Sequence, residues 1–145
     1  MNKIEEFLKN RLDYSNVKDG KAKEVMNFAQ IAWFLGKFGF ECIKVNADKH
    51  GADMLAYNID QSITFQIQIK GRPVLKKDYK CKNLYICYIM QAEKKICFYK
   101  HDEALALFEQ SKSANTKSWL ENEKYSWPSG NTPFDSVINK YDLDD

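Results

Sequence analysis

Three side chains in neighbouring stretches of the sequence combine an acid, an amide and an amine. Asp53 opens one apolar stretch, and Gln68 and Lys70 end the alternating run at 64–70, TFQIQIK. A carboxylate and an amide oxygen are hard oxygen donors of the kind that Mg²⁺ takes, and Mg²⁺ activates water for attack on a phosphate. The lysine can hold the attacking water or offset the negative charge that develops at phosphorus. This combination is typical of metal-dependent phosphodiester hydrolysis.

A β-hairpin would bring these three side chains together. Residues 53–59 and 62–70 are predicted to be strands, joined by a turn at 58–61, NIDQ. In the second strand the apolar positions 65, 67 and 69 face one side, and the polar positions 66, 68 and 70 face the other. The turn then places Asp53 across the ladder from Gln68 and Lys70. The plainer interpretation, a solvated polar face, accounts for most alternating strands.

Helices are predicted before and after this hairpin. The strongest signal covers residues 21–38, where apolar residues recur at helical spacing beside Glu24, and Gly39 is a typical C-terminal cap. Other helices are expected at 3–12, 102–109 and 116–122, and other strands at 40–45, 83–90 and 95–99. We therefore expect residues 1–145 to form one α/β domain. Its mixed central sheet of about five strands would be flanked by the 21–38 helix on one face and by the helix from 102 on the other.

The charge pattern points to an anionic partner at one place only. The net charge is +2, from 22 Lys and Arg against 20 Asp and Glu, but the segment 70–82 holds six bases and one acid. The residues expected to contact nucleic acid are Arg72, Lys76, Lys77, Lys80 and Lys82. Charge runs are more often solvated loops, and that interpretation stays open.

Other features exclude several classes of protein. The four cysteines form no C-x-x-C pair, so a zinc-finger spacing is absent and reduced, structural cysteines are expected. No apolar run has the roughly 18 residues that a membrane helix needs, and the first residues do not resemble a secretory signal. We expect a cytoplasmic protein with no membrane partner.

Residues 21–72 resemble the core of the PD-(D/E)xK nuclease superfamily, which has the restriction-endonuclease-like fold. The matching pieces are the helix with Glu24, the FGF segment at 38–40 that enters a strand, the GAD segment at 51–53, and the strand that ends at Lys70. The family order is a helix, a three-strand meander, a helix and a strand. Asp53 matches the family's first acid and Lys70 its lysine. Gln68 replaces the usual second acid, as in Mrr-type restriction nucleases, and this removes one negative charge from the metal site.

The resemblance implies an endodeoxyribonuclease that uses Mg²⁺, with Mn²⁺ as a substitute. Asp53 and the side-chain oxygen of Gln68 would bind the metal together with the backbone carbonyl of Ile69. Lys70 would position or polarise the nucleophile, and Glu24 would assist from the neighbouring helix. The substrate would be double-stranded DNA, and a symmetric homodimer would supply the two sites that a double-strand cut requires.

Two other functions remain open on the same fold. One is a non-catalytic nucleic-acid-binding or interaction module in which Gln68 marks lost chemistry. The other is a nuclease of the Holliday-junction resolvase type. Individual residues also have simpler explanations: Glu24 can serve the helix dipole alone, and His50, close to Asp53, is more often a bystander than a ligand.

Overall fold

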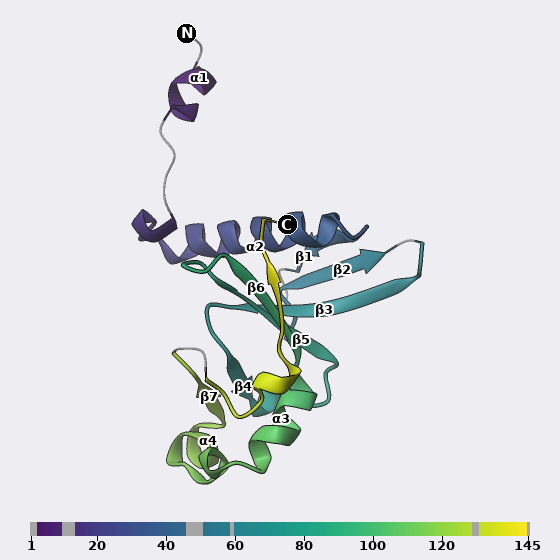
Figure 1. Ribbon diagram of the computed structural model, residues 1–145, viewed down its shortest axis with the longest axis vertical. Helices are drawn as coiled ribbons and strands as arrows, with labels where there is room; N and C mark the ends of the chain where they lie inside the picture. The colour runs from purple at the N-terminus through teal and green to yellow at the C-terminus, as the bar shows by residue number, and fades with distance from the viewer. Residues whose placement is uncertain (1–2, 10–13, 46–50, 59, 129–130, 145) are drawn as a thin grey trace.

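A six-stranded mixed sheet organises the computed structural model, which describes residues 3–9, 14–45, 51–58, 60–128 and 131–144 (Figure 1). Its strand order is β1-β2-β3-β5-β6-β8, and only β3 and β5 run parallel. The strands are β1 (Glu41–Lys44), β2 (Met54–Asn58), β3 (Ile63–Lys70), β5 (Leu84–Met90), β6 (Lys95–Lys100) and β8 (Asn139–Asp142). The α/β class and the mixed sheet are confirmed. The expected number of about five strands is one too low for this sheet, because the chain end adds β8.

A second, two-stranded sheet pairs β4 (Val74–Lys76) with β7 (Lys124–Ser126). Neither strand was predicted, because three residues are too few to show an alternating pattern. The α-helices are α1 (Lys3–Leu8), α2 (Gly20–Gly36), α3 (His101–Glu109) and α4 (Lys117–Asn122). Single turns of 3-10 helix are η1 (Tyr14–Asn16), η2 (Lys77–Tyr79), η3 (Lys112–Asn115) and η4 (Asp135–Val137). No helix in the described residues is long and apolar enough to span a bilayer.

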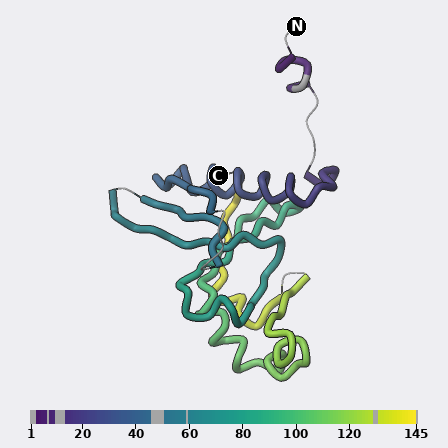
Figure 2. The backbone as a smooth tube through the Cα atoms, turned by 180° about the vertical axis from the view of Figure 1, so that it is seen from behind, coloured from purple at the N-terminus to yellow at the C-terminus, as the bar shows by residue number. Residues whose placement is uncertain are grey.

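The predicted packing of helices on opposite faces of the sheet is confirmed. Alternate residues of β5 point to opposite sides: Ile86 and Tyr88 join the core beneath α3, whereas Cys87 and Ile89 join the core beneath α2. The β2–β3 hairpin projects from the rest of the sheet beneath α2 (Figure 2). Because both faces are covered, the central strand β5 is buried along most of its length.

Gly39 closes the turn that follows α2, which ends at Gly36, two residues before the end that the sequence predicts. The Phe40 N–H donates to the Leu35 carbonyl at 3.2 Å, and the Gly39 N–H donates to the Gly36 carbonyl at 3.1 Å. This is the hydrogen-bond pattern of a Schellman motif, which requires a left-handed residue at the position of Gly39, and its φ is +85°. The motif turns the chain directly from α2 into β1.

The connection between β3 and β5 differs from the order that the resemblance implies. The family places a helix between the meander and the next strand, but residues 71–83 here contain β4 and the single turn η2. Parallel neighbours need a crossover, and in this protein the crossover is mainly extended chain. Its extended part pairs with β7, so the C-terminal region lies beside the end of β3.

The aromatic core beneath α3 should dominate stability, and Phe108 is at its centre. Phe108 is fully buried, and its ring centroid lies 4.9 Å from that of Trp119 and 5.5 Å from that of Trp127. We predict that Phe108→Ala lowers the free energy of unfolding by about 3–5 kcal/mol in urea denaturation, because it leaves a cavity. Leu120→Ala, at a side chain that is 59% exposed, is the control and should change it by less than about 0.5 kcal/mol. Equal effects of the two substitutions would contradict this assignment of the core.

Candidate functional site

A pocket of about 350 Å³ lies where β2 begins and β3 ends, against the first half of α2. We call it the Asp53 pocket. All five residues to which the sequence assigned a catalytic or metal-binding role line it: Glu24, Asp53, Gln68, Ile69 and Lys70. The remaining lining residues are Asn27, Phe28, Lys44, Val45 and Gly71. The fold therefore gathers residues that are more than forty positions apart in the chain.

The regular pairing of β2 with β3 ends just before Asp53. Met54 pairs with Ile67, and the Asp53 N–H also donates to the Ile67 carbonyl, at 2.8 Å, so the ladder is locally irregular at Asp53. On the other side, the Val45 N–H donates to the Asp53 carbonyl at 2.9 Å. Asp53 and Gln68 line the same pocket, although the regular ladder that the sequence predicts between them stops at Met54 and Ile67.

A hydrogen bond to the backbone holds the carboxylate of Asp53 in place. The Ile69 N–H donates to Oδ2 of Asp53 at 2.9 Å. Within an extended residue the N–H and the carbonyl point to the same side of the strand, so the Ile69 carbonyl oxygen lies on the same edge of β3 as Asp53. The bond restrains the carboxylate of Asp53, a lining residue of the pocket.

Gln68 carries a buried oxygen without a partner. The side chain is only 6% exposed, and Oε1 is a buried side-chain atom with no hydrogen bond in the structure. Burying such an atom without a partner costs about 1–3 kcal/mol. Buried polar groups are otherwise nearly always satisfied, so this oxygen requires an explanation, and a ligand in the pocket would supply one.

Two lysines and a second acid complete the walls of the pocket. Nζ of Lys70 lies 5.6 Å from the centroid of the Tyr79 ring, within cation–π distance. Lys44, in β1, was not predicted as a site residue, although it pairs with Met54 and so lies one ladder step from Asp53. The register, once known, would have identified it. Glu24 is exposed and approaches from α2.

The basic side chains of the segment 70–82 do not form one surface. Arg72 and Lys76 line a depression that adjoins the Asp53 pocket, whereas Nζ of Lys77 lies 5.2 Å from the centroid of a Trp119 ring. Lys80 and Lys82 line neither of these two cavities. The sequence treated the run as one surface, but the turn η2 and the bend after it direct its side chains to different sides.

A buried histidine that the sequence did not single out anchors this basic segment to α3. His101 is fully buried, and its Nε2 accepts a hydrogen bond from the Lys76 N–H at 3.2 Å. Its Nδ1 lies 3.1 Å from Oδ1 of Asp102, whose other oxygen accepts from the Cys81 N–H at 3.0 Å. Burial lowers the pKa of His101 from its ordinary value of 6.5, and the neighbouring Asp102 partly opposes this shift. The imidazole is therefore neutral at pH 7, with its proton on Nδ1.

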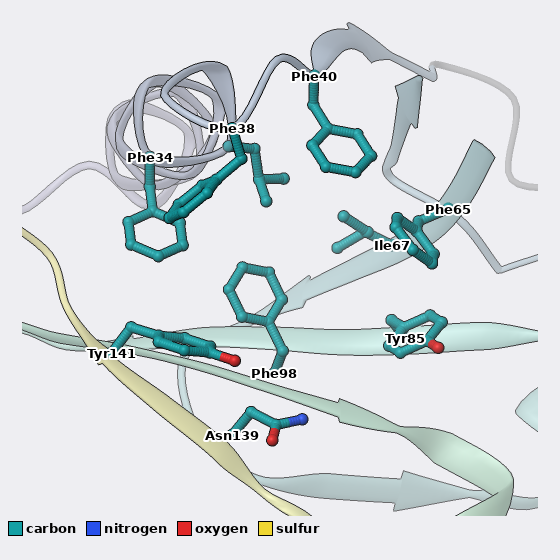
Figure 3. Close-up of a pocket in the computed structure, with 10 residues that line it drawn as sticks. Phe34, Phe38, Phe40, Phe65, Ile67, Tyr85, Phe98, Asn139 and Tyr141 are labelled. Atoms are coloured by element: carbon teal, nitrogen blue, oxygen red, sulfur yellow. The ribbon is translucent and has the colours of Figure 1, made fainter. Parts of the chain in front are cut away.

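A separate cavity of about 310 Å³ lies beneath α2 and is almost entirely apolar (Figure 3). Phe34, Phe38, Phe98 and Tyr141 crowd one side of it, and Asn139 is among its few polar neighbours. Its lining has no carboxylate, lysine, arginine, histidine or cysteine, and its ionisable groups are the hydroxyls of Tyr85 and Tyr141. Among the described residues, acidic and basic side chains meet in the Asp53 pocket instead.

No known protein family matches this chain, and no curated protein or solved structure matches it. In the part of the chain that the structure describes, no three or more His, Cys, Asp and Glu side chains group as metal ligands. Any cation in the Asp53 pocket would rely on amide and carbonyl oxygens beside carboxylate. His50 lies outside the described residues.

We predict that Gln68 lowers the free energy of unfolding, because its buried oxygen has no hydrogen-bond partner. Replacement by methionine, which has a similar shape, removes the unpartnered oxygen and should raise the free energy of unfolding by about 1 kcal/mol in chemical denaturation without added metal. Gln66→Met, at a half-buried position of the same strand, is the matched control and should be near neutral. A loss of stability in Gln68→Met would show that the amide is well satisfied.

We also predict a pH dependence that His101 causes. Below about pH 6.5 the unfolded chain protonates this imidazole, but the folded protein resists protonation, so the free energy of unfolding falls as the pH drops from that value toward the lower pKa of the folded state. His101→Gln retains an acceptor for the Lys76 N–H and removes the titrating group. Between about pH 7.5 and about pH 5.5 it should lose less stability than the wild type in urea titrations. Equal losses would contradict the prediction.

Proposed function

We propose that this protein is a metal-dependent endonuclease that hydrolyses phosphodiester bonds of DNA in the Asp53 pocket. One observation carries the proposal: Gln68, whose side-chain oxygen Oε1 is buried without a hydrogen-bond partner, lines the same pocket as Asp53, whose carboxylate is held by the Ile69 N–H. Two oxygen-bearing side chains at one pocket, one of them with an oxygen that lacks any hydrogen bond, are what a bound cation would require.

The donor set suits Mg²⁺ better than a transition metal. Asp53, Gln68 and the Ile69 carbonyl offer only oxygen, and Mg²⁺ is typically held by one or two carboxylates while it keeps several waters. Mn²⁺ accepts the same ligands and is the expected substitute. When bound, such an ion supplies Lewis-acid polarisation of the phosphate and makes water more acidic. Because Gln68 is neutral where the family has an acid, we expect weak metal binding.

The residues of this chain would divide the remaining work. Asp53 is held by the Ile69 N–H and so stays directed into the pocket during turnover. The Lys70 ammonium, at the pocket edge, would offset the negative charge that develops on the phosphate oxygens as water attacks and the bond to the leaving oxygen breaks. Glu24, on the opposite wall, would orient the attacking water and accept its proton. Lys44 adds a second cation on the side of β1.

The topology supports the restriction-endonuclease-like core as part of this proposal. Helix α2 precedes an antiparallel meander of β1, β2 and β3, and β5 then runs parallel to β3. The extended crossover in place of a helix is a departure from the family order. A double-strand cut needs two copies of the pocket, so the proposal includes a homodimer on duplex DNA.

Cleavage of supercoiled plasmid tests the proposal. The wild type should convert it to open-circular and linear forms with Mg²⁺ or Mn²⁺ and should lose this activity in EDTA. Asp53→Asn and Lys70→Ala should each lower the rate by about a hundredfold or more, because one removes ligand charge and the other removes charge stabilisation.

Asp60→Asn is the matched control, because Asp60 lies exposed in the turn at the far end of the same hairpin. It should cleave at the wild-type rate. Binding of DNA without cleavage under either divalent ion would contradict the nuclease and favour a non-catalytic binding module. Activity confined to branched DNA would assign the chain to junction resolution.

A further inference from the structure

A second depression of about 350 Å³ begins at the end of β3 and continues over the small β4–β7 sheet. We call it the basic cleft. Four cationic side chains line it, and no acidic residue is among its lining: the cations are Lys70, Arg72, Lys76 and Lys124. The hydroxyl-bearing residues Ser118, Tyr125 and Ser126 line it as well. A depression with four positive charges and several hydroxyl groups has the chemistry of a phosphate-binding surface.

The backbone forces two of these cations together. Lys76 and Lys124 are directly opposite in the antiparallel β4–β7 pair. Like charges in this position destabilise a sheet, and the ion pair of Lys76 with Asp78, at 3.8 Å and largely exposed, compensates little. An anion between the two ammonium groups would reverse the sign of this interaction. The repulsion is therefore explained if the cleft is built for a negatively charged ligand.

The frame beneath the cleft is rigid enough to hold the charges in place. Leu75, which lies between Val74 and Lys76 in β4, is fully buried. The Trp127 N–H donates to the Pro73 carbonyl at 3.0 Å. On the other side, the Val74 N–H donates to the hydroxyl of Tyr99 at 2.8 Å. Together with the bond from the Lys76 N–H to His101, these contacts hold the backbone at Pro73, just before β4, and at Val74 and Lys76 within β4. The ligand would meet a preformed surface.

The basic cleft and the Asp53 pocket adjoin each other. Lys70 and Gly71 line both, and no other atom lies within 4 Å of the position that a Cβ would take at Gly71. A ligand that spans both must carry one anionic group at the pocket and further anionic groups along the cleft. A chain of phosphodiesters has this repeating charge, and a single phosphate does not.

We propose that the basic cleft binds the sugar-phosphate backbone of the nucleic acid strand whose scissile phosphate occupies the Asp53 pocket, with Lys124 as a contact residue. The proposal rests on the proposed function for the direction of the strand, but binding in the cleft needs neither a metal nor cleavage. It moves the expected contact surface away from Lys80 and Lys82 and onto β7, which lies more than forty residues later in the chain than β4.

Salt-dependent DNA binding tests the cleft. A short fluorescein-labelled single strand and its duplex are titrated with protein in EDTA, and fluorescence anisotropy gives log K against log salt concentration. Lys124→Gln should reduce the magnitude of the slope by about one and weaken binding roughly five- to eightfold at about 0.1 M salt, since one phosphate contact is lost. The control is Lys112→Gln, at an exposed lysine on η3 outside the cleft, which should bind as the wild type does.

Thermal unfolding separates binding from folding. Because Lys124→Gln relieves a like-charge contact, its midpoint should equal or exceed that of the wild type. A lowered midpoint with weakened binding would assign Lys124 a structural role and overturn the proposal. So would an unchanged slope, or binding of inorganic polyphosphate with no binding of either DNA. Stronger binding of the single strand or of the duplex identifies which source of backbone the cleft takes, and either supports it.

The cleavage experiment and the binding experiment test the nuclease and the basic cleft separately. If plasmid stays intact under every divalent ion but Lys124→Gln weakens DNA binding, the result supports DNA binding in the basic cleft and contradicts the nuclease. Cleavage that depends on Asp53, with no Lys124 effect, would do the reverse. Asp53→Asn should bind the labelled DNA in EDTA at least as well as the wild type, because it removes a negative charge near the phosphates.

Discussion

The register between β2 and β3 is the constraint on which the rest of the site depends. A shift of one residue would turn every side chain of a strand to the other face of the sheet and would move Asp53 away from the Ile69 N–H that binds its carboxylate. The buried partners Met54 and Ile67 prevent that shift, because either would have to leave the core beneath α2. The apolar half of the hairpin therefore positions its polar half, and the Ile69 N–H then fixes the carboxylate that this register delivers.

The site is polar at the cost of stability. Gln68 buries an oxygen without a hydrogen bond, and Lys76 faces Lys124 across a short sheet. Both features oppose folding, and the aromatic core beneath α3 and the core beneath α2 must offset them. The two unfavourable interactions lie in adjoining cavities that share Lys70 and Gly71. A single surface that binds both an anion and a cation would account for both of them.

The crossover from β3 to β5 links the site to the C-terminal half of the chain. Its strand β4 pairs with β7, and its turn is held to α3 through His101 and Asp102. The basic wall of the cleft thus depends on contacts formed late in the sequence, on the far side of the sheet from α2. Protonation of His101 would disturb the bond from the Lys76 N–H, because the doubly protonated ring has no acceptor left.

Local patterns in the sequence determined most of α2, predicted at 21–38 and observed at 20–36, the hairpin, and the sharing of one face of β3 by Gln68 and Lys70, because hydrophobic period and turn residues act over a few neighbours. They also indicated the opposite placement of α2 and α3. The sequence did not reveal the strands β4, β7 and β8 or the roles of Lys44, His101 and Lys124. Each of these depends on pairing between distant segments or on burial. The sequence also showed the basic run at 70–82. Only the tertiary structure decided which of its lysines face the pocket, because a turn redirects side chains that are adjacent in sequence. Pairing across the sheet is a long-range interaction, and the residues that it joins leave no periodic signal in either segment alone.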